Sequence, residues 1–176
     1  MRSHPAPELR PTTAQFRAAM GRFATGVAVV TTVAAEFDHA MTANSFTSVS
    51  LEPLLTLVSV ERLTRFHDAI LESGLWTVSI LPVQARETAV WLATKGRRLV
   101  DQLDRVPHRR SAVTGAAVVE GALAVVECAT WATYDGGDHT LVVGEVLSVE
   151  VPDADSGPAP LLHHRGRYAT LRPLQE

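Results

Sequence analysis

The chain has 176 residues and a mass of 19.0 kDa, which is the length of one domain and enough to bury a hydrophobic core. Apolar residues make up 46% and charged residues 20%, with a net charge of −3, so a mainly disordered chain and a broad basic surface for nucleic acid are excluded. The lone cysteine, Cys128, excludes a disulfide framework and a thiolate metal cluster. A polar N-terminus and the lack of a long apolar run predict a cytoplasmic protein without a membrane span.

The N-terminal part is expected to contain a flexible segment followed by a helix. Residues 1–11 hold three prolines among polar residues and are expected to be flexible, ahead of a single domain over 12–176. The helix is expected to begin at Thr12 or Thr13 and to end at Gly26. Within it, apolar residues recur at helical spacing: Phe16, Ala19, Met20 and Phe23.

From residue 27 onward the sequence is rich in Val and Thr, which suit a pleated, half-buried surface. Five such segments are predicted strands: 27–33, 54–60, 76–81, 122–134 and 140–151. Two more helices are expected over 64–73, with Gly74 as a stop, and over 83–94. Strands outnumber helices and the longest follow one another, which favours an antiparallel barrel with helices at its rim over alternating βαβ units.

The predicted strand 122–134 is apolar on both of its alternating faces. One face carries Leu123, Val125, Ala129 and Trp131, and the other carries Val126, Cys128 and Tyr134. A sheet with one wet face would alternate cleanly, so the second face needs a cover. Because a domain of this size has few helices to spare, the pattern predicts a homodimer.

Common catalytic and nucleotide-binding motifs are missing. The sequence contains no GxGxxG, no GxxxxGK[ST], no HExxH and no GxSxG. His163 and His164 are adjacent, so on a strand they would point to opposite faces and could not share a metal. No metal site is therefore expected.

The segment 39–51, HAMTANSFTSVSL, mixes hydroxyl and amide side chains with a few apolar ones. Such a segment could pair with a planar ligand rich in oxygen and nitrogen, and its small residues would let the ligand approach the backbone. It could equally be a Ser/Thr-rich edge strand followed by a turn. Composition alone leaves both interpretations open.

Four blocks resemble the flavin reductase-like family, and they occur in that family's order. They are GVAVVTT at 26–32, MTANSFTSVSLEP at 41–53, GGDHTLVVGEV at 136–146 and PLLHHRGRY at 160–168. The resemblance implies a mainly β fold, the FMN-binding split barrel of Greek-key type, with a few peripheral α-helices. It also implies an NAD(P)H-dependent flavin reductase, the small component of a two-component monooxygenase, which reduces FAD or FMN with NADH or NADPH.

The resemblance also assigns roles to individual residues. Along the isoalloxazine and ribityl chain it places Thr42, Ala43, Asn44, Ser45, Ser48, Val49 and Ser50. In the stretch VERLTRF at 60–66 it places Arg62 and Thr64 at the flavin phosphate, whereas Phe66 stands where a second hydroxyl is common. Weaker retention of the phosphate is therefore expected, with flavin behaving as an exchangeable substrate. On the NADH side it places His139, Arg167 and Tyr168.

Several alternatives stay open. His139, at the head of a strand, could instead be a structural hydrogen-bonding residue. The arginine-rich stretch 97–110 is either a solvated helix end or a lid that meets a second phosphate, and the second possibility slightly favours FAD. Hydride transfer needs positioning rather than a protein nucleophile, so no catalytic residue is expected. The alternative functions are a non-catalytic flavin- or haem-binding split barrel and an enzyme like pyridoxamine phosphate oxidase.

Overall fold

The computed structural model describes residues 10–152 and 157–172. The expected flexible segment 1–11 therefore lies almost wholly outside the described residues. The centre of the molecule is a seven-stranded antiparallel sheet in the order β3-β2-β6-β9-β10-β5-β4. Its strands are β2 (Ala28–Ala34), β3 (Phe37–Ala43), β4 (Thr47–Leu51), β5 (Leu54–Glu61), β6 (Leu75–Ile80), β9 (Ala124–Gly136) and β10 (His139–Glu150).

Smaller elements surround this sheet. One small sheet joins β1 (Thr25–Gly26), β11 (Leu162–His164) and β12 (Arg167–Ala169), and a hairpin joins β7 (His108–Arg110) and β8 (Ala117–Val119). The helical elements are α1 (Thr13–Met20), α2 (Arg65–Ser73), the short 3₁₀ turn η2 (Val83–Ala85) and α3 (Arg86–Ala93). No helix in the described ranges is long and apolar enough to cross a membrane.

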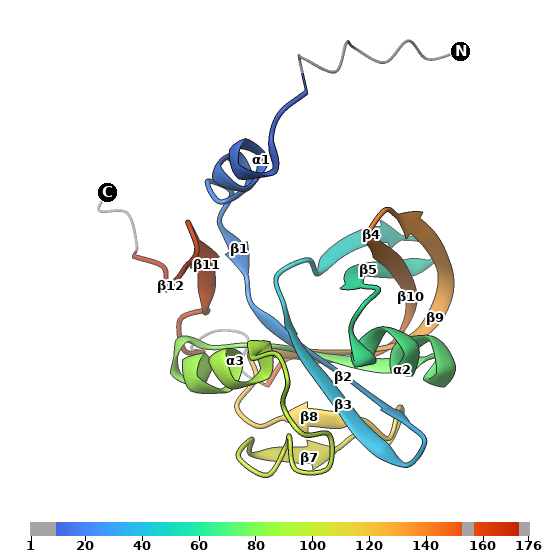
Figure 1. The fold of residues 1–176 in the computed structure, drawn as a ribbon. Helices are drawn as coiled ribbons and strands as arrows, with labels where there is room; N and C mark the ends of the chain where they lie inside the picture. The colour runs from blue at the N-terminus through green and yellow to red at the C-terminus, as the bar shows by residue number, and fades with distance from the viewer. Residues whose placement is uncertain (1–9, 153–156, 173–176) are drawn as a thin grey trace.

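The large sheet curls because its two edge strands are consecutive in the chain. Strand β3 ends at one edge and β4 begins at the other, and only residues 44–46 join them. Three residues can bridge only about 14 Å between flanking Cα atoms, even fully extended, so the two edges approach each other at this point. Figure 1 shows the resulting curled sheet with the helices at its periphery. The expected mainly β, barrel-like architecture is confirmed.

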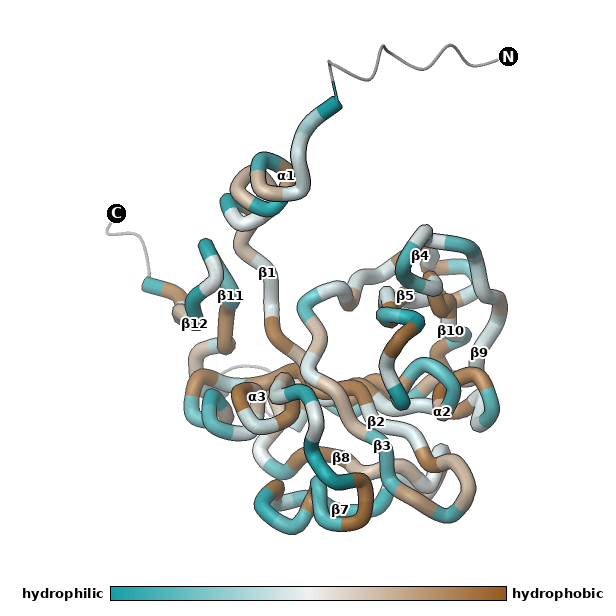
Figure 2. The backbone as a smooth tube through the Cα atoms, in the orientation of Figure 1, coloured by the Kyte–Doolittle hydropathy of each residue, from teal (hydrophilic) through white to brown (hydrophobic). Residues whose placement is uncertain are grey.

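Two hydrophobic clusters lie on opposite faces of β2. Val29 belongs to an outer cluster with Leu92 of α3, and Val30 belongs to an inner cluster with Phe66 of α2 and Trp76 of β6. Figure 2 shows the apolar residues of this strand in brown. A strand that is buried on both faces has apolar or β-branched residues at consecutive positions, as residues 27–33 do.

The expected helices are largely present, but α1 ends earlier than its pattern predicted. It stops at Met20 with Gly21 as its C-cap, and the expected end at Gly26 is wrong. The Arg165 N–H donates to the Gly21 carbonyl at 2.8 Å, and the chain after Gly21 goes on to pair with β11 as strand β1. Tertiary strand pairing therefore overrides the helical spacing that continues to Phe23.

Strand β9 is covered mainly at its beginning. Val125 and Cys128 lie on opposite faces, yet both are buried within the same protomer. Val126 is half-buried and packs against the inner cluster. Trp131 and Tyr134 are more than half exposed. The pairing with β10 shifts register twice, so burial changes along the strand instead of dividing its two faces cleanly.

Candidate functional site

A cavity of about 580 Å³ lies beside the 44–46 connection, between β3, the start of α2 and the turns that follow α3. Its volume is in the range of small-molecule binding sites. Of the residues to which the resemblance assigns a binding role, six line it: Thr42, Ala43, Asn44, Ser45, Thr64 and His139. The fold therefore brings together residues that lie up to about a hundred positions apart in the chain.

The wall formed by residues 42–45 is fixed by its own hydroxyl groups. The Thr42 hydroxyl donates to the Ala89 carbonyl of α3 at 2.7 Å. The Ser45 hydroxyl donates to the Ser59 carbonyl of β5 at 3.1 Å and accepts the Ser59 N–H at 3.2 Å. The exposed Asn44 amide bonds to no other residue in the described part of the chain, so it is free to bind a ligand.

A second wall is the start of α2. Thr64 is the N-cap residue, but its hydroxyl donates to the Glu61 carbonyl at 2.8 Å and caps no helical amide. The backbone amides of Arg65 and Phe66 have no acceptor within the described ranges. Free amides at a helix N-terminus, together with the helix dipole, attract anions. Because Thr64, Arg65 and Phe66 all line the cavity, this end of it suits a phosphate.

The same end of the cavity is electropositive. Arg65 and Arg97 both line it, and neither makes an ion pair with a carboxylate of the described residues. The Arg65 guanidinium donates to the Arg97 carbonyl, and Arg97 donates to the Ala40 carbonyl at 3.0 Å. Burial and the neighbouring Arg65 lower the pKa of Arg97, and the same two causes lower the pKa of His39. An anion placed between the two guanidinium groups would relieve their mutual repulsion.

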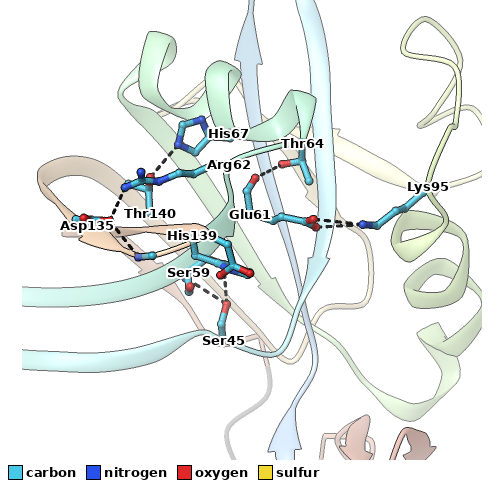
Figure 3. A network of polar contacts seen from close by, with 12 residues as sticks. Ser45, Ser59, Glu61, Arg62, Thr64, His67, Lys95, Asp135, His139 and Thr140 are labelled. Atoms are coloured by element: carbon cyan, nitrogen blue, oxygen red, sulfur yellow. Dashed lines mark hydrogen bonds and ion pairs between the residues drawn. The ribbon is translucent and has the colours of Figure 1, made fainter. Parts of the chain in front are cut away.

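His139 borders the cavity at the start of β10. Its Nδ1 lies 2.7 Å from the carboxylate of Asp138, and its side chain is 39% exposed. The hydrogen bond from His139 and the charge of that ring lower the pKa of Asp138. The neighbouring Thr140 hydroxyl lies 2.9 Å from Nε2 of His67 on α2, so the first turn of α2 and the start of β10 are tied together (Figure 3).

The other residues assigned to the flavin lie outside this cavity. The Arg62 side chain makes an ion pair with Asp135 at 2.8 Å, in the group of contacts drawn in Figure 3. Ser48, Val49 and Ser50 lie on β4, an edge strand of the sheet, and Val49 is 51% exposed. The structure thus places the residues 42–45 in the cavity and residues 48–50 beyond it.

The two residues assigned to the C-terminal part of the NADH site are also outside the cavity of their own protomer. Arg167 and Tyr168 lie on β12, in the small sheet with β1 and β11. The Tyr168 ring packs against the outer cluster, with the Arg86 guanidinium 5.8 Å from its centroid. Burial raises the pKa of the Tyr168 hydroxyl.

Sequence reasoning missed Arg65 and left the role of Arg97 open, although both line the cavity. Arg65 is the first residue of α2, and its place directly after an N-cap threonine was the available signal. Arg97 belongs to the arginine-rich stretch that was expected to be either a helix end or a lid. Helix α3 ends at Ala93, and Arg97, Leu99 and Gln102 all line the cavity, so part of this stretch forms a cavity wall.

The chemistry of the cavity fits a flavin nucleotide. Apolar side chains can lie against a planar ring, and they include Met41, Leu63 and Leu99. The Asn44 amide can donate to or accept from the ring edges and the ribityl hydroxyls. The Thr42 and Ser45 hydroxyls, whose protons go to backbone carbonyls, can only accept. The free amides at the start of α2 and the two arginines suit the phosphate. The described residues contain no group of three possible metal ligands, and burial raises the pKa of Cys128 to about 12, so this thiol stays protonated.

A curled antiparallel sheet with this cavity beside the 44–46 connection defines a mainly β, barrel-like protein with a site of nucleotide size. The model of the flavin reductase like domain matches residues 20–172, and the chain belongs to this family.

Three similar proteins represent the relatives. An NADH-dependent FMN reductase of Streptomyces nodosus subsp. asukaensis is 36% identical over 171 residues, which cover 92% of this chain and 86% of the relative. The reductase subunit of a flavin-dependent monooxygenase of Mycobacterium tuberculosis is 35% identical over 159 residues, which cover 90% and 82%. The solved NADH:FAD oxidoreductase of Streptomyces globisporus is 36% identical, with a TM-score of 0.86 and coverage of 97% and 100%.

Proposed function

We propose that this protein is an NADH-dependent flavin reductase that reduces FAD or FMN and supplies reduced flavin to a partner monooxygenase. The observation that carries the proposal is the cavity itself, in a chain that belongs to the flavin reductase-like family. One part of the cavity lining is the polar wall of residues 42–45, and another part offers free helix amides and two arginines. This arrangement matches the two ends of a flavin nucleotide.

When bound, the flavin supplies the chemistry, because its ring accepts a hydride from the nicotinamide. The chain has to hold the two ligands in contact and in the correct orientation. Ala43 is small and buried, so it lets a ring approach the backbone, while Asn44 and Ser45 fix its polar edge. We assign His139 to the nicotinamide side, as the family resemblance implies, and its place in the cavity lining is consistent with contact to a ligand.

The phosphate is held, in this proposal, by the start of α2 and by arginine side chains. Arg65 and Arg97 replace Arg62 as the principal basic groups, because they line the cavity and lack carboxylate partners among the described residues. Arg62 would have to leave Asp135 before it could contribute. Phe66 is buried in the inner cluster and offers the phosphate only its backbone amide.

We also propose that the protein is a homodimer and that the site is completed across the interface. The support is the projection formed by α1, β1, β11 and β12, which extends away from the barrel in Figure 1. No residue of α1 is buried within the protomer. A second copy would cover this projection, and it could bring Arg167, Tyr168 or residues 48–50 to the neighbouring cavity.

The alternative functions are a non-catalytic flavin- or haem-binding barrel and an amine oxidase that uses bound FMN. The three relatives described above are all named as reductases or oxidoreductases, which favours reduction of flavin. We propose that the reduced flavin reaches the partner by diffusion, and that the protein is cytoplasmic because NADH is supplied there.

The direct test mixes the purified protein with NADH and either FMN, FAD or riboflavin, and follows the nicotinamide absorbance. We expect NADH consumption that depends on both enzyme and flavin. The Arg65→Gln variant should lose affinity for FMN and FAD while keeping its affinity for riboflavin, which has no phosphate. NADH consumption no faster than the uncatalysed reaction with every flavin would refute the proposal.

A further inference from the structure

Glu61 is the one carboxylate among the described residues that line the cavity. It is the last residue of β5, and its backbone carbonyl accepts both the N–H of Thr64 at 3.2 Å and the Thr64 hydroxyl at 2.8 Å. This places the acidic residue one tight turn before the start of α2. A negative charge therefore borders the part of the cavity that is otherwise built to receive a phosphate.

Lys95 faces Glu61 from the turns after α3. Its Nζ lies 3.2 and 3.4 Å from the two carboxylate oxygens of Glu61, and it too lines the cavity. Figure 3 shows the two side chains meeting from different segments of the chain. The Lys95 side chain is 84% exposed and that of Glu61 is 36% exposed. An ion pair this exposed contributes little, so it compensates the carboxylate only in part.

The carboxylate opposes the binding of a phosphorylated ligand. A phosphate monoester carries a charge of about −1.5 to −2 at neutral pH, by analogy with phosphorylated side chains. Bringing it into the same cavity as Glu61 costs free energy through like-charge repulsion, which Arg65 and Arg97 have to overcome. The same carboxylate has no such effect on a ligand without a phosphate.

From this placement we infer that Glu61 is an affinity-limiting residue that keeps the flavin nucleotide exchangeable, with Lys95 as the counter-ion that moderates it. The inference rests on the proposed reductase function, in which reduced flavin has to leave the enzyme to reach its partner. Repulsion between Glu61 and the phosphate raises the free energy of the bound state and so speeds release. Glu61 thereby sets the residence time of the nucleotide, and we expect it to have little effect on a ligand without a phosphate.

The test compares Glu61→Gln and Lys95→Gln with the wild type by equilibrium binding of FMN, FAD and riboflavin at low salt. Glu61→Gln should bind FMN and FAD about three- to tenfold more tightly, and Lys95→Gln should bind them more weakly by a similar factor. Riboflavin affinity should stay within about twofold in both variants. Stopped-flow measurements should show slower FMN release from Glu61→Gln, and added salt should reduce the difference.

Glu150→Gln is the matched control. Glu150 forms an exposed ion pair with Arg109, away from the cavity, and its replacement changes the net charge by the same amount. It should leave all three affinities unchanged. Melting curves of each variant establish that it is folded.

Three results would overturn the inference. Unchanged FMN affinity in Glu61→Gln would mean that the carboxylate is not felt by the phosphate. Weaker binding of riboflavin and FMN together would mean that Glu61 holds the ring or the ribityl chain. An equal gain in Glu150→Gln would assign the effect to net charge alone. If the wild type binds none of the three flavins and consumes no NADH with them, it is the proposed reductase function that fails.

Discussion

At the scale of single residues, His139 offers the clearest separation of a ligand-binding role from a structural one. It borders the cavity, yet its Nδ1 also lies within hydrogen-bonding distance of the exposed Asp138 carboxylate at the head of β10. We expect His139→Ala to raise the KM for NADH or to lower the rate of hydride transfer, with little change in flavin affinity. Stopped-flow kinetics at saturating flavin measure this directly.

A purely structural role of His139 predicts a different result, which a thermal melt can distinguish. If the side chain mainly anchors the strand, His139→Ala should lower the melting temperature and weaken NADH and flavin binding together. Arg167→Ala is a useful companion because Arg167 lies outside the cavity of its own protomer. If it meets a cofactor phosphate from the partner subunit, kcat/KM should fall roughly ten- to a hundredfold. Normal NADH kinetics in both variants would remove these residues from the site.

His39 predicts how stability depends on pH. Burial and the positive charge of Arg65 lower the pKa of His39 in the folded protein below its ordinary value of about 6.5. The unfolded chain therefore binds more protons in the interval between the two values. The neutral His39 therefore costs the folded state nothing above about pH 6.5. As the pH falls from there through the folded pKa, the free energy of unfolding decreases.

We therefore expect the urea midpoint of the wild type to fall between pH 7 and pH 5, and His39→Gln to show a smaller fall. The comparison needs only denaturant titrations of both proteins at the two pH values. An identical fall in the two proteins would show that other groups account for the pH dependence.

At the scale of elements, β10 approaches the Trp76 ring so closely that the strand requires a glycine at position 144. A Cβ at Gly144 would collide with the Trp76 ring and lie 2.9 Å from the Cβ of Cys128. Trp76 and Cys128 are fully buried, so neither can move aside easily. We expect Gly144→Ala to lower the free energy of unfolding by about 1–3 kcal/mol, the usual cost of overpacking a core.

Gly26→Ala is the matched control for this prediction, because a Cβ at Gly26 meets no atom within 4 Å. Denaturant unfolding of both variants gives the comparison. Equal stability of Gly144→Ala and the wild type would mean that β10 can shift away from Trp76.

The elements also show what sequence patterns can and cannot predict. Strand β2 and helix α2 follow directly from local signals, since a β-branched run and a Thr64-to-Gly74 cap pair need no knowledge of the rest of the fold. The end of α1 was missed because pairing with β11, far along the chain, decides it. Arg65 was missed and the role of Arg97 was left open for the same reason, since their convergence depends on how α2 and the turns after α3 pack.

At the scale of the whole molecule, the exposed apolar residues bear on assembly. Phe16, Met20 and Phe23 are 59%, 52% and 69% exposed, and they project from or follow a helix with no buried residue. The apolar pattern of strand β9 predicted a dimer, but not every apolar residue of that pattern is available to an interface. Val126 packs inside its own protomer, so a charge there would damage the fold before it could report on assembly. Trp131, which is 55% exposed, is the better probe on that strand.

We expect sedimentation at micromolar concentration to give about twice the chain mass of 19.0 kDa. Phe16→Asp should shift this toward the monomer, because a charge would be buried without a partner in the interface. Its melting curve should keep a cooperative transition, since α1 buries none of its residues within the protomer. Trp131→Glu tests whether the exposed end of β9 shares the same interface. Val113→Glu, at a residue 46% exposed and outside the cavity, is the control for adding surface charge. If the interface completes the site, Phe16→Asp should lose NADH:flavin activity in proportion to its loss of dimer. A fully active monomeric wild type would contradict both the assembly and the shared site, and it would leave Arg167 and Tyr168 without a route to the ligand.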